Sequence, residues 1–191
     1  MSIQPGEVLE FWFAERTRKL WFATDAAFDA EIRSRFGSAP DDAARGALDA
    51  WAETPDAALA LVIALDQFPR NLHRGTAAAF AHDAQARRAA AGAIERGFDA
   101  ATALDRRMFF YLPFEHSELL ADQERSIALF TRWAAEHPEP LRAQAEDQLS
   151  YAVRHHEIIQ RFGRFPHRNR VLDRTSTAEE LAFLTEPKSS F

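Results

Sequence analysis

The chain has 191 residues, of which 47% are hydrophobic, and this is enough for one folded domain with a sizeable core. Its formal net charge of −6 argues against a general nucleic-acid surface, because such surfaces neutralise phosphates with basic patches. The absence of cysteine excludes disulfide bonds, thiolate metal sites and a cysteine nucleophile.

The N-terminal sequence MSIQPGEVLEFWF has no basic segment before its apolar residues, and Glu7 and Glu10 interrupt it, so we expect no signal peptide. No apolar run in the sequence approaches the ~18 residues of a membrane-spanning helix. These features predict a cytoplasmic protein without membrane or nucleic-acid partners.

Helix-forming residues dominate the sequence, and the alternation typical of β-strands is missing, so we predict an all-α fold. A short apolar helix opens the chain. The second helix begins after Thr24 as N-cap and ends at Gly37, and the third follows Pro40. The fourth begins at Thr54-Pro55, and Pro69 is expected to end it.

Further helices are predicted over 76–96 and 104–112, then from Ser117 to His137 and from Pro140 to Phe162, where Gly163 ends the helix. A short segment starts at Pro166. The sequence STAEE predicts a last helix, with Ser176 as N-cap and Glu179 three residues later. About eight or nine helices joined by short connections predict a single domain over 1–191, with a loose tail at 186–191.

Three polar clusters interrupt these apolar stretches, and the first is LDQFPRN. Helical spacing places Asp66 near the buried face, with Gln67 beside it, and Arg70 and Asn71 follow Pro69. Asp66 and Arg70 could pair. These side chains therefore either form hydrogen bonds with unpaired backbone groups at the end of the helix or contribute to a ligand site.

The second cluster is FFYLPFEHSE, in which Glu115 and His116 lie among aromatic residues. A histidine beside a carboxylate in an apolar bend can act as a general acid or base. Alternatively, Ser117 or His116 caps the helix that follows.

The third cluster, HHEIIQRFGRFPHRN, is the densest. Arg161 lies one turn after Glu157 and is expected to pair with it. Arginines beside a helix start at Pro166 favour a carboxylate or phosphate ligand. The alternative is a network of arginine-carboxylate pairs that holds the C-terminal helix against acidic groups such as Glu115 or Glu118.

Other familiar chemistries have weaker support in the sequence. The dipeptide His82-Asp83 occurs in metal phosphohydrolases, but no second ligand has a recognisable spacing. There is also no Gly-rich phosphate loop and no GxSxG or HExxH motif. We therefore expect neither a metal site nor a cofactor.

Together, LDQFPRN with a following RG, FFYLPFEHSE with ADQERS behind it, and HxxIIxRFGRFPHRN with a downstream Arg-Thr-Ser-Thr-x-Glu-Glu resemble a bacterial family. This family is catalogued as domain of unknown function 924, and the resemblance spans nearly the whole chain. It implies a tetratricopeptide-like superhelix of antiparallel helix pairs. This fold agrees with the number of predicted helices. The spacing of Ser126, Phe130, Trp133 and Pro138 weakly echoes the second helix of such a repeat, and one weak echo does not establish a repeat array.

The resemblance supplies a fold and a set of signature positions rather than a reaction. The resemblance implies a small or hydrophobic residue where this chain has Glu115, and a residue other than histidine at His82. Both differences count against a mechanism that depends on Glu115 or a metal site at His82-Asp83. The signature positions in this chain are Asp66, Gln67, Arg70, Asn71, His116, Glu118, His156, Arg161, Arg164, His167, Arg168 and Asn169.

These observations lead to three hypotheses. In the first, the clusters converge on a concave pocket that binds a small anionic molecule, with His116 or His156 available for proton transfer if the protein is an enzyme. The donors would be Arg70, Arg161, Arg164 and Arg168. In the second, a concave helical face binds a peptide or a partner protein, and the arginine motifs brace the turns. In the third, every motif is structural and the binding surface lies elsewhere. The sequence decides neither catalysis nor oligomeric state.

Overall fold

The computed structural model describes residues 3–187 and 189–190, and in this part of the chain every regular element is helical. The predicted all-α fold is therefore confirmed. Contacts divide the chain into two compact units. Unit 1 comprises Met1–Arg74 and Ala78–Pro113, and unit 2 comprises Gly75–Ala77 and Phe114–Phe191. The single domain predicted over 1–191 stays a prediction.

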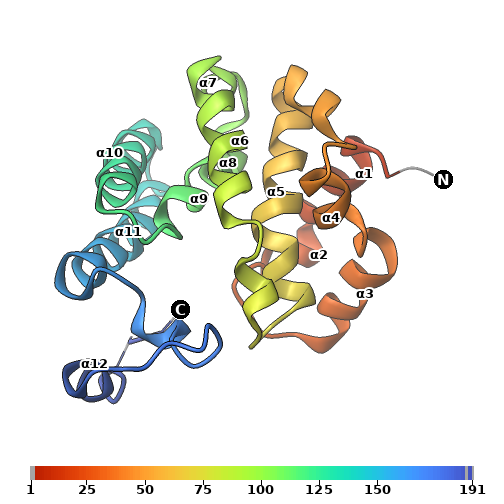
Figure 1. Cartoon of the computed structure of the whole chain (residues 1–191). Helices are drawn as coiled ribbons and strands as arrows, with labels where there is room; N and C mark the ends of the chain where they lie inside the picture. The colour runs from red at the N-terminus through yellow and green to blue at the C-terminus, as the bar shows by residue number, and fades with distance from the viewer. Residues whose placement is uncertain (1–2, 188, 191) are drawn as a thin grey trace. The chain divides into compact units, whose positions relative to one another are not determined.

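The first part of the chain holds short helices around one long one (Figure 1). The elements are α1 (Pro5–Trp12), α2 (Glu15–Arg18), α3 (Ala26–Phe36), α4 (Ala39–Ala44), η1 (Asp49–Glu53), α5 (Pro55–Leu72), η2 (Ala77–Phe80), α6 (Asp83–Glu95), α7 (Phe98–Ala101), α8 (Leu104–Arg107) and η3 (Met108–Phe110), where η denotes a 3-10 helix.

Helix α5 is the centre of unit 1. Its sequence ALALVIAL is apolar on all sides, and such a helix is stable only when other elements cover it. It contacts α1, α3, α4, η1, α6 and η3. Aromatic rings fill the space around it, with Trp12 and Phe68 in edge contact at 5.7 Å and Phe36 stacked on Phe68 at 5.2 Å between ring centroids.

The predicted end of the fourth helix at Pro69 is wrong, because α5 continues through Pro69 to Leu72. A proline inside a helix removes one backbone hydrogen bond. Burial of α5 among its neighbours outweighs this loss. The Asp66 carbonyl also accepts a hydrogen bond of 2.6 Å from Arg70 Nη1, which holds the Arg70 side chain along the helix.

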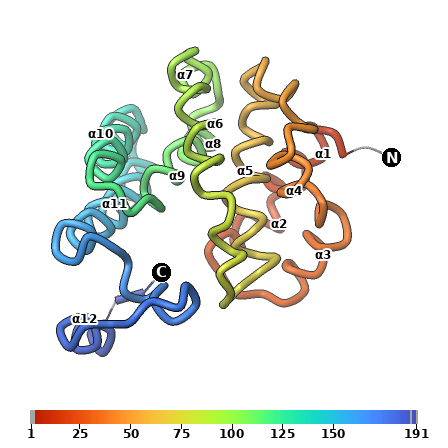
Figure 2. The backbone as a smooth tube through the Cα atoms, in the orientation of Figure 1, coloured from red at the N-terminus to blue at the C-terminus, as the bar shows by residue number. Residues whose placement is uncertain are grey.

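Unit 2 is built on an antiparallel pair of long helices, α10 (Leu120–Glu136) and α11 (Arg142–Phe162), which lie side by side in Figures 1 and 2. The short helix α9 (Leu112–Glu115) crosses the boundary between the units, and η4 (Pro166–Arg168) and α12 (Ala178–Phe183) follow α11. Gly163 ends α11 with φ of 67°, as predicted, because glycine adopts this left-handed conformation without a steric penalty. Behind it, Ile158, Ile159, Phe165 and Phe183 form one buried cluster.

Several predicted helices are divided, so the chain has more helical segments than the eight or nine expected. The third predicted helix becomes α4 and η1, separated near Gly46 with φ of 81°. The helix predicted over 76–96 becomes η2 and α6, and the one over 104–112 becomes α8 and η3, with Pro113 inside α9. Helix propensity alone did not reveal these interruptions, because the same residue types occur on both sides of each one.

Some predicted helix starts are displaced by one to three residues. The N-cap of α3 is Asp25 rather than Thr24, and its side chain accepts the Phe28 amide at 2.8 Å. Helix α10 begins at Leu120, not at Ser117. The last helix is capped by Thr177 rather than Ser176.

Part of the tail predicted to be loose is bound to the fold. Ser189 is buried, and its hydroxyl donates to the Leu184 carbonyl at 3.2 Å. Lys188 and Phe191 lie outside the described residues. No helix in the described ranges is long and apolar enough to cross a membrane. The tetratricopeptide-like superhelix stays a prediction.

Candidate functional site

The first polar cluster is engaged within unit 1. Arg70 donates to Asp83 at 2.9 and 3.2 Å, and Arg70 Nη1 lies 3.4 Å from Asp66 Oδ1, so the predicted pair of Asp66 with Arg70 is confirmed. Gln67 Nε2 donates to Asp66 Oδ2 at 2.6 Å. Burial alone would lower the pKa of Arg70, but the charges of Asp66 and Asp83 outweigh it and raise that pKa.

Asn71, the last residue of this motif, and Arg74 bind a second helix. Asn71 Nδ2 donates to Asp29 Oδ1 at 2.8 Å, and Arg74 Nε donates to Asp29 Oδ2 at 2.6 Å. Asp29 lies on α3, and Asp83 lies at the start of α6. The motif LDQFPRN therefore connects α5 to α3 and α6 through Asp29 and Asp83, which the sequence did not predict as its partners.

The second cluster forms the bend between α9 and α10. Gln123 is fully buried on α10, and its Nε2 donates to the carbonyls of Glu115 at 2.7 Å and Ser117 at 2.6 Å. The Ser117 hydroxyl accepts the Leu119 amide at 3.2 Å and donates to Asp122 at 2.6 Å. These contacts stabilise the bend and the first turn of α10.

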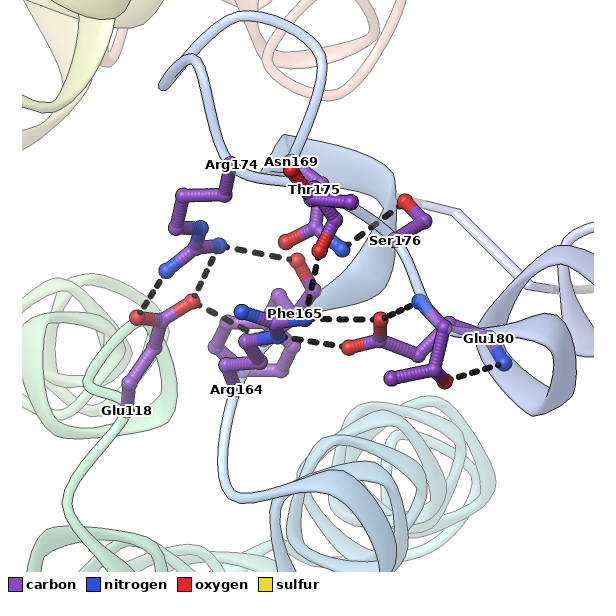
Figure 3. Close-up of polar contacts among 9 residues, drawn as sticks. Glu118, Arg164, Phe165, Asn169, Arg174, Thr175, Ser176 and Glu180 are labelled. Atoms are coloured by element: carbon purple, nitrogen blue, oxygen red, sulfur yellow. Dashed lines mark hydrogen bonds and ion pairs between the residues drawn. The ribbon is translucent and has the colours of Figure 1, made fainter.

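Glu118 and Arg174 bind the backbone N–H and the backbone carbonyl of one residue, Phe165, in the third cluster (Figure 3). Glu118 Oε1 accepts the Phe165 amide at 2.8 Å, while Arg174 Nη2 donates to the Phe165 carbonyl at 3.2 Å. Arg174 also donates to Glu118 at 2.7 and 3.0 Å. Burial alone would raise the pKa of Glu118, but the hydrogen bonds from Arg174 and Phe165 outweigh it and hold that pKa below its ordinary value.

Arg164 forms a second ion pair, with Glu180, which Figure 3 also shows. It donates to Glu180 from Nε at 2.6 Å and from Nη2 at 2.8 Å, in the two-point geometry that suits a guanidinium and a carboxylate. Hydrogen bonds from Arg164 lower the pKa of Glu180 to about 2. Glu180 also accepts the Thr177 amide at 2.7 Å, which completes a capping box at the start of α12.

The other arginines of this motif are also engaged. Arg161 Nε donates to Glu179 at 2.9 Å, so the predicted pair with Glu157 is wrong; Glu157 lies 3.5 Å from Arg154 instead. The Arg161 side chain is long and exposed, so it can reach more than one carboxylate. The position of α12 in the fold selects Glu179 as its partner. Arg168 is 6% exposed, donates to the His116 carbonyl at 3.1 Å and lies over the Phe165 ring.

The structure places His155, rather than the predicted His156, against this cluster. His155 Nδ1 lies 2.8 Å from the Tyr151 carbonyl and 3.3 Å from Glu115 Oε1, and its ring meets Phe165 edge on. Burial lowers the pKa of His155 to about 3, and the charges of His116, Arg168 and His167 add to this effect. His156 is half-buried on the neighbouring face of α11, which a one-residue step on a helix explains.

His167 lies near the same charges. Burial, followed by the charge of Arg168, lowers the pKa of His167 to about 4. Among the described residues, no group of three acidic or histidine side chains could hold a metal ion. With neutral imidazoles and internally bound guanidinium groups, this cluster is suited to holding the chain in one conformation.

The second and third clusters therefore meet within unit 2, where Arg168 binds His116 and Glu118 binds Phe165. Asn169 is buried there as well, and its Nδ2 donates to the Ser176 hydroxyl at 3.0 Å. The first cluster belongs to unit 1, so convergence of all three clusters stays a prediction.

The sequence placed Arg174 and Glu180 in the downstream motif Arg-Thr-Ser-Thr-x-Glu-Glu but did not assign either of them to the site. A signal for Glu180 was present, because Thr177 and Glu180 fit the capping-box pattern as well as Ser176 and Glu179 do. No local signal pairs Arg174 with Glu118, since 56 residues separate them.

Comparisons with known proteins identify the family of this chain. Residues 8–188 match the family model described as bacterial protein of unknown function (DUF924). A solved structure of a protein of unknown function from Agrobacterium tumefaciens is similar to this chain, with 43% sequence identity and a TM-score of 0.85 over 95% of this chain and 96% of that one. None of the curated proteins matches the chain. On the family match and this relative, the chain belongs to the DUF924 family of bacterial proteins.

Proposed function

We propose that this chain is a helical protein-interaction module whose arginine motifs are structural. One observation carries the proposal: the arginines of both motifs bind groups of their own unit. Arg70 binds Asp83, Arg161 binds Glu179, Arg164 binds Glu180, and Arg168 binds the His116 carbonyl. Guanidinium groups that already have internal partners are poor donors for a ligand, because binding would break existing hydrogen bonds.

The distribution of exposed apolar side chains supports a protein partner. Large exposed hydrophobic residues of unit 2 are Leu119, Leu120, Leu141, Tyr151, Val153 and Leu181, whereas Phe22 is the one in unit 1 among the described residues. Helical pairs commonly bind an amphipathic helix of a partner through such side chains. We therefore propose an amphipathic segment of another protein as the partner of α10–α12.

The rival proposal is a small anionic ligand held by Arg70, Arg161, Arg164 and Arg168, with His116 or His156 transferring protons. It requires the first three arginines to exchange a carboxylate of the chain for a carboxylate or phosphate of the ligand. This exchange would also leave Glu180, which is 2% exposed, as a buried carboxylate without its counter-charge.

Site-specific photocrosslinking in cells tests the interaction module. A photoreactive residue replaces Tyr151 or Leu181, and a matched variant carries it at exposed Glu95 in unit 1. We expect one protein to crosslink at the first two positions and not at Glu95. Purified partner should then protect amides of α10–α11 from hydrogen exchange, and Tyr151→Asp should abolish this protection. A purified partner that binds Tyr151→Asp equally well would contradict the proposal.

A thermal-shift screen with anionic metabolites and nucleotides tests the rival. A ligand at a hundred times its Kd would stabilise the protein by ~2.7 kcal/mol. Arg164→Ala is the test variant, and Arg170→Ala is its control, because Arg170 is exposed. Stabilisation that is lost in Arg164→Ala and kept in Arg170→Ala would favour the anionic ligand. A lower Tm of Arg164→Ala, with no shift by any compound, would favour the structural role.

A further inference from the structure

A cavity of about 290 Å³ lies within unit 1, next to α1. Glu10 and Phe13 line it from α1 and its C-cap, Asp56 from the first turn of α5, and Arg106 from α8. Its volume is at the lower limit of the ~300–1,000 Å³ typical of ligand pockets, which restricts any ligand to a small molecule. None of these residues belongs to the arginine motifs or to the proposed protein-binding surface.

Arg106 differs from the neighbouring Arg18. Both guanidinium groups lie over the Phe13 ring, at 4.8 Å for Arg106 and 5.7 Å for Arg18. Arg18 is engaged, since it donates to Asp105 at 2.7 Å and to the Phe13 carbonyl at 3.0 Å. Arg106 forms no ion pair with a carboxylate of the described residues, although Glu10 and Asp56 line the same cavity. The ring thus positions a guanidinium whose donors remain available to a ligand.

The charges of the cavity restrict the ligand further. Two carboxylates and one guanidinium give a net charge of −1, from Glu10, Asp56 and Arg106. A phosphorylated ligand would meet both carboxylates, and a simple diamine would leave Arg106 without a counter-charge. A molecule with two amino groups and one carboxylate matches all three side chains. Leu9 and Phe13 add an apolar wall for an aliphatic stem.

We propose that this cavity binds a basic amino acid, with its α-carboxylate on Arg106 and its two cationic groups on Glu10 and Asp56. The site is independent of the proposed protein-interaction function. Lysine, ornithine and arginine are the members of this class to test. They differ in stem length and in the cationic group, so the ranking of their affinities reports the distance between the two carboxylates.

Isothermal titration calorimetry on the whole protein tests the proposal. We expect L-lysine or one of its two analogues to bind. Norleucine lacks the side-chain amine and cadaverine lacks the carboxylate, so both should bind at least about tenfold more weakly. No heat with lysine, ornithine or arginine would overturn the proposal, and so would equal binding of norleucine.

Three variants separate the roles of the side chains. Arg106→Leu should weaken amino-acid binding at least about tenfold but should not weaken the binding of cadaverine, because it removes a like charge from the site, and Glu10→Gln should weaken both. Gly6→Trp should block the cavity with every charge retained, because Gly6 lines the cavity and a Cβ added there meets no atom within 4 Å. Glu15→Gln, an exposed carboxylate outside the cavity, is the control. Full binding by Gly6→Trp, confirmed as folded by its Tm, would place the ligand elsewhere and overturn the proposal.

Discussion

Phe165 is fully buried, and both its ring and its backbone are bound. Its ring lies 5.4 Å from that of His155 and 4.4 Å from the Arg168 guanidinium, and its peptide groups bind Glu118 and Arg174. At the residue scale, Phe165 is thus held by the Arg168 guanidinium against its ring and by the Glu118–Arg174 ion pair on its backbone. The protein therefore needs the motif for its stability, whether or not a ligand binds.

Replacing Phe165 by alanine should lower the free energy of unfolding by ~3–5 kcal/mol, because it opens a cavity in a packed core. Urea unfolding at neutral pH measures this. The control is Phe22→Ala, since Phe22 is 61% exposed and its loss should cost no more than ~0.5 kcal/mol. Similar losses in the two variants would show that Phe165 is not a core residue.

Buried histidines predict a pH dependence of stability. The pKa values of His155 and His167 fall from 6.5 to about 3 and about 4 on folding, so the unfolded chain binds more protons at mildly acidic pH. The free energy of unfolding therefore does not depend on the titration of these two histidines above pH 6.5. It decreases as the pH falls from 6.5 towards their pKa values in the folded protein, by up to ~1.4 kcal/mol per pH unit for each group.

Urea unfolding between pH 7 and pH 5 measures this effect, because the lowered pKa values of Glu118 and Glu180 act below that range. The groups around the two imidazoles are Glu115, Glu118, His116, Arg168 and Arg174. We expect the loss of stability on acidification to be smaller in His155→Gln and His167→Gln than in the parent, and unchanged in the exposed control His73→Gln. An unchanged pH profile in both test variants would show that other groups control it.

At the scale of elements, α12 has only six residues, which is too short to be stable alone. Its capping box, the ion pairs of Glu179 and Glu180, and the packing of Phe183 on α11 hold it in place. The arginine motif therefore supplies the charges that connect this short helix to the end of the long one.

Thr177→Ala should destabilise α12 by ~1 kcal/mol, because Thr177 Oγ1 accepts the Glu180 amide at 3.1 Å. Hydrogen exchange of that amide should accelerate. In the control Ser176→Ala, the Glu180 amide should exchange at its original rate, since Ser176 binds Asn169 instead. The opposite pattern would restore Ser176 as the cap.

For the whole molecule, the division into two units raises the question of whether they unfold together. Tryptophan reports on each unit separately, because Trp12, Trp21 and Trp51 lie in unit 1 and Trp133 lies in unit 2. Arg164→Ala removes an ion pair of unit 2 only.

Trp133 is observed in a background in which the other three tryptophans are replaced by phenylalanine. In this background we expect Arg164→Ala to shift the change in Trp133 fluorescence to a lower urea concentration. In a Trp133→Phe background, the unit 1 signal should keep its original midpoint. Midpoints that fall together in both backgrounds would instead identify one cooperative unit.

The sequence by itself determined the all-α class, the end of α11 at Gly163 and the pair of Asp66 with Arg70, because these depend on local propensity and helical spacing. Tertiary structure decided which of His155 and His156 faces the core, and the continuation of α5 through Pro69. It also decided the partners of Arg161, Arg164 and Glu118. Arginine and glutamate side chains can reach several neighbours, so only the positions of distant segments select one ion pair among them.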